Sequence, residues 1–132
     1  MSESGKIIVG MGGWSLPSFD RHFYPPETQT ARGFRKLEFY SRFFDMVEVN
    51  ATFYSTELNA KNAQQWLEDV SGNKNFVFAV KLFQGFTHSR DATKQEESAV
   101  HSMLGPLTKN EKLAGLVIQF PSSVHHTREN RD

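Results

Sequence analysis

The sequence predicts an α/β fold in which parallel strands are joined by helical crossovers. Four short runs of apolar residues alternate with segments whose apolar residues recur at helical spacing. The segments between the runs are long enough to hold a helix, as the connection between two parallel strands requires. A single domain, residues 1–132, is expected, because this length suits one folding unit and no linker, repeat or low-complexity segment divides the chain.

The expected strands are apolar runs that end at turn residues. Gly12 and Gly13 follow the first run, and Pro121 stops the last one. The second run contains the segment VEVNATFY, and the third is FVFAVKLF. The four predicted strands cover residues 6–11, 46–54, 76–83 and 116–120.

Helices are expected where apolar residues recur every three or four positions. One spans roughly residues 31–44, and a second lies between Asn59, a suitable N-cap, and Gly72, just past its end. A third contains residues 100–107, and Pro106 is expected to kink or restart it. Loops are expected over residues 14–33 and 84–91, and the polar tail, residues 122–132, suits the start of another helix.

The second strand carries a polar stripe that an ordinary buried strand lacks. Side chains alternate between the two faces of a strand, so one face is assigned Val47, Val49, Ala51 and Phe53, against the helices. The other face is assigned Glu48, Asn50, Thr52 and Tyr54. The third and fourth strands repeat this pattern, with a bulky face and a sparser face that ends in Lys81 or Gln119.

The stripe favours a barrel over an open sheet. In a doubly wound sheet both faces of a central strand meet helices and should be apolar. In a TIM barrel only one face meets helices, and the other looks into the lumen. The sequence therefore predicts a partial TIM-barrel-like fold of about four βα units. The alternative is a sheet with one solvated face, on which Glu48 and Lys81 contact water. A structural ion pair between these two residues is a further alternative, inside a barrel as well.

The candidate site is the rim, meaning the carboxyl ends of the strands and the loops that follow them, where barrel enzymes carry their chemistry. Glu48 suits a general base or metal ligand, because a desolvated carboxylate is a stronger base. Lys81 suits an anion anchor or a Schiff-base amine. His88 suits proton transfer near neutral pH. These three are the predicted catalytic residues, and the predicted substrate-binding residues are Trp14, Ser15, Asn50, Tyr54, Thr87 and Gln119.

Several of these residues also fit simpler, purely structural interpretations. His88 also fits an exposed loop histidine. The aromatic residues of the first loop, Trp14, Phe23 and Tyr24, fit either stacking on a ring-shaped substrate or packing under the loop. Residues 10–13 fit a tight turn better than a phosphate cradle, because the third glycine of G-x-G-x-x-G is missing. No metal site is predicted and no cofactor is identified.

Composition narrows the classes of function. The 15 basic and 15 acidic residues balance, which argues against a general nucleic-acid binder. The absence of Cys removes thiolate catalysis and Cys-based metal sites. No apolar segment approaches the ~20 residues of a membrane span. A soluble, cytoplasmic protein without a membrane partner is therefore expected.

Several segments resemble, in order, the YecE-like family, known as domain of unknown function 72. They are VGMGGWS (9–15), FYPP (23–26), VEVNATFY (47–54), VKLFQGFTH (80–88) and LGPL…LVIQFP (104–121). The resemblance implies a TIM-barrel-like fold and no assigned activity. The chain departs from the family at Met11-Gly12, where a Thr-Ser pair is commoner, and at Ser122, where a second Pro is usual.

The resemblance also implies that members of the family are long enough for eight βα units. This chain provides about four, as in a truncated barrel. Two functions are therefore predicted. One is an enzyme acting on a small polar substrate, such as a sugar, a sugar phosphate or a phosphodiester, at the rim. The alternative is a non-catalytic binding or scaffold protein. Self-association through the open half-barrel is expected in either case.

Overall fold

Four strands form one parallel sheet in the order β1-β2-β3-β4. The computed structural model describes residues 4–131. This order follows the chain, as in a barrel, whereas a doubly wound sheet reverses its strand order part-way. The predicted α/β fold with parallel strands is confirmed. The strands are β1 (Gly10–Met11), β2 (Met46–Val49), β3 (Val77–Lys81) and β4 (Leu113–Val117).

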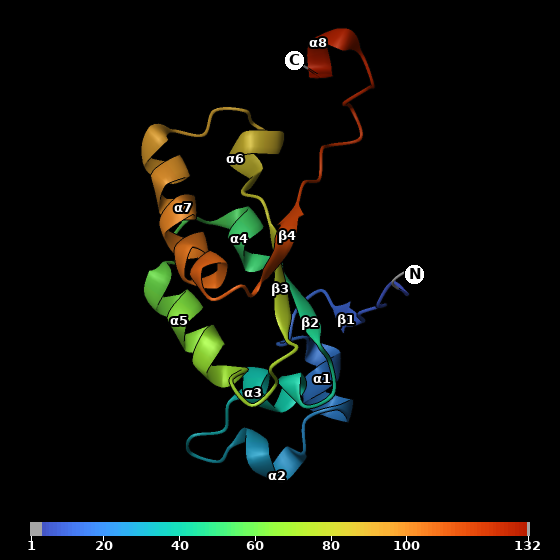
Figure 1. Cartoon of the computed structure of the whole chain (residues 1–132), viewed down its shortest axis with the longest axis vertical. Helices are drawn as coiled ribbons and strands as arrows, with labels where there is room; N and C mark the ends of the chain where they lie inside the picture. The colour runs from blue at the N-terminus through green and yellow to red at the C-terminus, as the bar shows by residue number, and fades with distance from the viewer. Residues whose placement is uncertain (1–3, 132) are drawn as a thin grey trace.

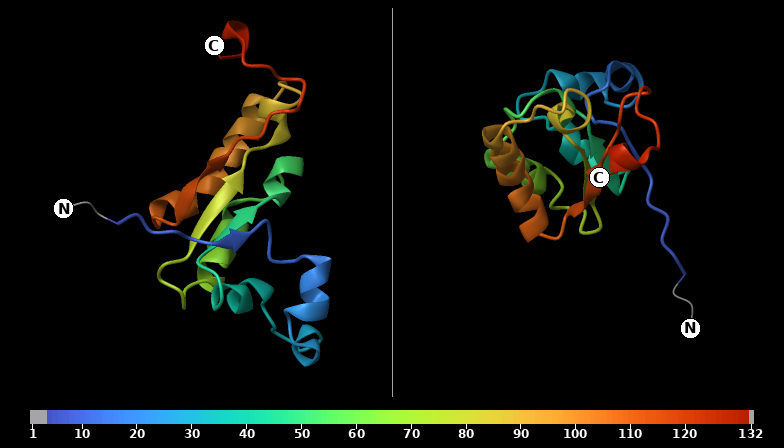
Figure 2. Two further views of the ribbon diagram at one scale, coloured as in Figure 1. Left: turned by 90° about the vertical axis from the view of Figure 1, so that its right-hand side faces the viewer. Right: turned by 90° about the horizontal axis from the view of Figure 1, so that it is seen from above.

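Two long helices cover one face of the sheet (Figure 1 and Figure 2). They are α5 (Ala60–Asp69) and α7 (Lys94–Lys109), and each begins with a capping box in which Asn59 or Thr93 accepts a hydrogen bond from a first-turn amide. The shorter helices are α1 (Pro17–His22), α2 (Pro26–Gln29), α3 (Lys36–Ser41), α4 (Ala51–Tyr54), α6 (Gln84–Thr87) and α8 (Arg128–Arg131). Within residues 4–131, no helix is long and apolar enough to cross a membrane.

The second strand is shorter than predicted. It ends at Val49, and the residues assigned to its second half form α4. The hydroxyl of Thr52 lies 3.0 Å from the carbonyl oxygen of Val49 and 2.7 Å from that of Lys81, which turns the chain after the strand. Thr52 is buried and Tyr54 is exposed, so the prediction that the four polar residues share one face was wrong beyond Asn50.

Other boundaries also differ from the prediction. The predicted loops over residues 14–33 and 84–91 contain α1, α2 and α6, because Pro17 and Pro26 each start a helical turn. Of the first predicted strand, only the last two residues form β1. Strand β4 begins three residues earlier in the chain than the last predicted strand. Helix α7 runs through Pro106 without restarting.

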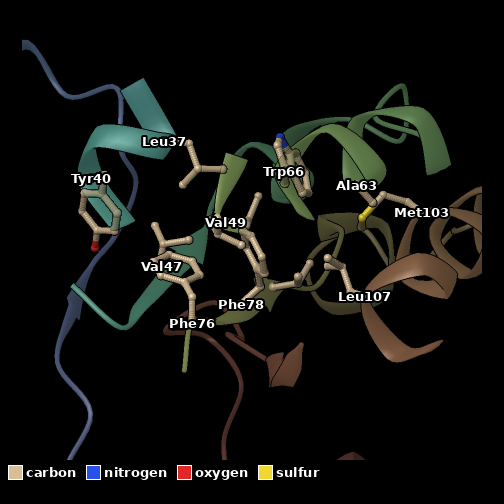
Figure 3. Packing of buried hydrophobic residues seen from close by; sticks show 12 residues of the cluster. Leu37, Tyr40, Val47, Val49, Ala63, Trp66, Phe76, Phe78, Met103 and Leu107 are labelled. Carbon is tan, nitrogen blue, oxygen red and sulfur yellow. The ribbon is translucent and has the colours of Figure 1, made fainter. Parts of the chain in front are cut away.

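The core lies between the sheet and the helices (Figure 3). Val47 and Val49 on β2, and Phe78 and Val80 on β3, are fully buried on this helix face. The intervening residues, among them Glu48, are only partly buried, so they lie on the opposite, inner face. The core residues of the strands and helices are Leu37, Tyr40, Val47, Val49, Ala63, Trp66, Val70, Phe76, Phe78, Val80, Met103 and Leu107.

A tyrosine hydroxyl joins β1 to β2. Tyr40 accepts a hydrogen bond from the Met11 amide at 2.8 Å and donates one to the Met46 carbonyl at 2.8 Å. The two strands approach closely beside it, because a Cβ atom on Gly10 would lie only 2.1 Å from the Met46 oxygen. Gly10 is therefore required for this strand pairing.

Replacing Tyr40 by Phe is expected to lower the free energy of unfolding by about 1–3 kcal/mol, because two backbone groups lose their partner. Burial raises the pKa of the Tyr40 hydroxyl, although the hydrogen bond from Met11 opposes the shift. The folded protein therefore holds this proton more tightly than the unfolded chain, and stability falls as the pH rises above about 10. Urea unfolding of Tyr40→Phe should show the lower stability at neutral pH and a shallower alkaline loss.

Part of the alkaline loss should remain in this variant, because burial and the nearby Asp20 carboxylate also raise the pKa of Tyr24. The exposed Tyr54 supplies the control, and Tyr54→Phe should leave the stability at neutral pH unchanged. Equal stability of Tyr40→Phe and the unmodified chain would contradict the bridging role.

Candidate functional site

The loop after β1 and the end of β2 enclose a hollow with a volume of about 200 Å³. It brings together four of the predicted site residues: Trp14 and Ser15 from the loop after β1, Glu48 on β2, and Asn50 just after β2. The lining of the hollow consists of Gly12, Gly13, Trp14, Ser15, Leu16, Glu48, Val49, Asn50 and Ala51.

Backbone contacts fix the shape of this hollow. The side-chain amide of Asn50 donates a hydrogen bond of 2.9 Å to the carbonyl oxygen of Gly12. Gly13 has a φ of 137°, which favours glycine. The carbonyl of Trp14 accepts a hydrogen bond from the Tyr24 hydroxyl, and the Trp14 ring packs edge-on against Trp66 with centroids 5.7 Å apart. The Trp14 ring is therefore engaged in packing beneath the loop.

Glu48 lines the hollow from the inner face of β2. The register pairs it with Ala79 on β3, and its neighbours along the strand are buried on the other face. Within residues 4–131, its carboxylate makes no hydrogen bond or ion pair with another side chain. A partly buried carboxylate of this kind can accept a hydrogen bond or a proton from a ligand.

A second group of predicted residues gathers at the end of β3. The ammonium nitrogen of Lys81 lies 4.7 Å from the ring centroid of Phe53, a distance at which a cation is attracted to an aromatic face. The imidazole of His88 packs edge-on against the same ring, with centroids 5.1 Å apart and an angle of 83°. Lys81 and His88 are called the basic pair below.

Phe53 was predicted to face the helices, and this prediction was wrong. The turn into α4 carries it to the rim, between the two members of the basic pair. Thr52 determines this placement, because its hydroxyl contacts the Lys81 carbonyl oxygen. A contact between residues so far apart in the chain leaves no local signal in the sequence.

Glu48 and Lys81 are not joined in the structure. They lie on neighbouring strands, but Lys81 is two residues further along the sheet than Ala79, the partner of Glu48. Within residues 4–131, Lys81 has no carboxylate within ion-pair distance, so the structural ion pair considered above is not formed.

Comparisons with known proteins identify the family of this chain. The family model described as "Protein of unknown function DUF72" matches residues 8–132. The chain belongs to the DUF72 family. UPF0759 protein YunF of Bacillus subtilis (strain 168) is 33% identical over 130 residues, which cover 94% of this chain and 43% of that relative. The predicted resemblance to this family is confirmed.

Two solved structures share the fold of this DUF72 chain. A DUF72 family protein of Enterococcus faecalis V583 aligns with a TM-score of 0.67 at 22% identity, covering 91% of this chain and 42% of that structure. A DUF72 family protein of Thermotoga maritima MSB8 aligns with a TM-score of 0.64 at 22% identity, covering 93% and 47%. The chain therefore spans less than half the length of each of these relatives.

The remaining predicted residues of the DUF72 chain lie apart from the hollow or beneath the surface. Thr87 is buried, and its hydroxyl lies 2.9 Å from Nδ1 of His88. Tyr54 is exposed and contacts Phe53 edge-on. Gln119 is exposed beyond the end of β4 and lines neither the hollow nor the basic pair. Across residues 4–131, no three carboxylate or imidazole groups converge as metal ligands would.

A larger hollow, of about 750 Å³, lies at the opposite end of the sheet. Arg35 there forms ion pairs with Glu68 and Asp69. Burial raises the pKa of the Asp69 carboxyl, and the Arg35 charge opposes that shift. The amino ends of barrel strands generally serve stability, so the carboxyl-end rim is the stronger candidate for function.

Proposed function

We propose that this DUF72 chain binds a small polar substrate at the rim and supplies acid–base groups for an enzymatic reaction of a sugar, a sugar phosphate or a phosphodiester. One observation carries the proposal. Glu48 is a carboxylate without a protein partner among residues 4–131, and it lines a hollow beside Ser15 and Asn50. Structural carboxylates in such positions are usually paired, because an unpaired charge loses hydration without compensation.

The lining of the hollow suits a molecule with several hydroxyl groups. Glu48 accepts a hydrogen bond from a substrate hydroxyl or water and can take its proton. The Asn50 amide donates to Gly12, and its side-chain carbonyl oxygen makes no hydrogen bond within residues 4–131, so it can accept one from a ligand. Ser15 is exposed and offers both a donor and an acceptor. Together these groups recognise hydroxyl patterns rather than apolar surface.

Replacing Glu48 by Gln is expected to weaken binding of a polar ligand about tenfold or more, because a hydrogen bond to a charged acceptor is exchanged for a neutral one. Backbone amide shifts in NMR spectra would be followed while a neutral hexose, a hexose phosphate and a phosphodiester are added in turn. Glu27→Gln is the matched control, since Glu27 is exposed on α2, far from the rim. Failure of every compound to shift the Gly12, Ser15 and Asn50 amides would contradict the proposal.

The second candidate is binding without turnover, as in a scaffold protein. The separation of Glu48 from the basic pair favours it, because general acid and base groups must both reach the reacting atoms. Product formation from the compound that binds separates the two candidates. A ligand that binds in a Glu48-dependent manner and is recovered unchanged would support the binding role.

A further inference from the structure

The basic pair has the surroundings of an anion site. Lys81 and His88 lie against the same Phe53 ring, at 4.7 Å and 5.1 Å from its centroid. Within residues 4–131, neither Lys81 nor His88 forms an ion pair with a carboxylate. What distinguishes this pair from exposed basic residues such as Lys94 is that both side chains contact one partly buried ring. Lys81 therefore presents a positive charge that no described carboxylate neutralises, with the His88 imidazole against the same ring.

Buried threonines hold both members of the pair in place. The Thr52 hydroxyl contacts the Lys81 carbonyl oxygen at 2.7 Å and thereby joins α4 to the end of β3. The Thr87 hydroxyl contacts Nδ1 of His88 at 2.9 Å, so Nε2 is the ring nitrogen left for a ligand. Thr87 is 2% exposed, which shows that this contact is built into the interior of the rim. The His88 imidazole and the backbone of Lys81 are thus positioned before any ligand arrives.

Phe53 strengthens the attraction of Lys81 for an anion by keeping water away from part of its ammonium group. Its ring is partly buried and covers one side of the Lys81 ammonium. Charge interactions strengthen where water is displaced. An ammonium group binds phosphate as a point charge, and a protonated imidazole adds a second donor.

We propose that the basic pair binds the phosphate group of a phosphorylated substrate, a proposal that rests on the function proposed above and narrows its substrate class. Lys81 is two residues further along the sheet than Ala79, the partner of Glu48. A rise of about 3.3 Å per residue and a strand spacing of about 4.8 Å place the Cα atoms of Glu48 and Lys81 roughly 8 Å apart. A small sugar phosphate spans this distance, with its hydroxyl groups at Glu48 and its phosphate at the basic pair.

Inorganic phosphate, the neutral hexose and the hexose phosphate are the probes that test this proposal, with NMR shifts of the rim amides and of the His88 imidazole as the readout. Phosphate should shift His88 in the unmodified chain. Lys81→Met and His88→Gln should each weaken binding of phosphate and hexose phosphate about tenfold, while binding of the neutral hexose changes less than twofold. Lys81→Arg should retain binding, because it keeps the charge.

Lys94→Met and His101→Gln are the matched controls, since both residues are basic and exposed on α7. They should leave phosphate binding unchanged. Phosphate binding that survives both Lys81→Met and His88→Gln would overturn the phosphate site. If the neutral hexose then still bound in a Glu48-dependent manner, the proposed function would stand and only this inference would fail. Absence of binding by all three probes would overturn this inference, and absence of binding by the phosphodiester as well would overturn both.

Discussion

The purified 132-residue chain is expected to form dimers or larger assemblies rather than a 15.1 kDa monomer. A closed barrel has no sheet edge, whereas this sheet has two, at β1 and β4. Large apolar side chains are exposed beside both of them. They are Ile7, Ile8, Val9 and Met11 near β1, and Leu116, Ile118 and Phe120 at and after β4.

The geometry of the two edges favours pairing between copies of the chain. All four strands run in the same direction, so β4 of one copy can pair in parallel with β1 of another. Apolar surface contributes about 25 cal/mol per Å² when it is removed from water. Covering both edges and the inner face can therefore stabilise an assembly by several kcal/mol, a large part of a typical stability of about 5–15 kcal/mol.

Light scattering after size-exclusion chromatography measures the mass directly. The double variant Ile118→Lys, Phe120→Glu should shift the population toward monomer, because charges on an exposed edge oppose pairing. Tyr54→Ser is the control, since it removes a side chain that is 69% exposed but lies away from both edges. A monodisperse monomer that unfolds cooperatively at high temperature would mean that the chain shields its inner face by itself.

Replacing Phe78 by Ala is expected to destabilise the fold by about 3–5 kcal/mol, the usual cost of removing a buried aromatic side chain. Phe78 is 0% exposed. Its ring stacks on Trp66 with centroids 6.1 Å apart and meets Phe76 edge-on at 5.2 Å. The substitution therefore removes contacts from the layer that attaches α5 to β3.

Denaturant unfolding, repeated at several protein concentrations, separates this effect from any change in association. Phe120→Ala provides the matched comparison, because the same atoms are removed from a side chain that is 49% exposed. It should cost much less than Phe78→Ala at the lowest protein concentration. A loss below about 1 kcal/mol for Phe78→Ala would contradict the described core.

The order and direction of the strands could be predicted from the sequence because they depend on periodicity and connection length. The helix-facing sides of β2 and β3 were predicted for the same reason, since alternation is a property of the backbone. The end of β2 could not be predicted. Residues 50–54 continue a strand-like pattern, but the chain turns into α4, where the Thr52 hydroxyl contacts the carbonyl of Lys81, 29 residues away.

In the candidate site, the face on which Glu48 and Lys81 lie could be predicted from the same alternation. Glu48 and Lys81 lie on strands whose alternation was correctly assigned, and both are on the inner face. Phe53 was missed because a turn that starts after Val49 changes the face on which every later side chain lies. Thr87 was assigned to the surface because sequence does not distinguish an exposed hydroxyl from one buried against a neighbouring imidazole.

Helix α4 couples the two sites of the rim, so that a displacement of this helix affects both. Asn50 precedes this single turn and contacts the loop after β1, whereas Phe53 within it contacts Lys81 and His88. The Thr52 hydroxyl fixes the same turn to the ends of two strands. Any displacement of these few residues must alter the hollow and the basic pair together. The two halves of the rim are therefore one mechanical unit, although their charged groups come from different strands.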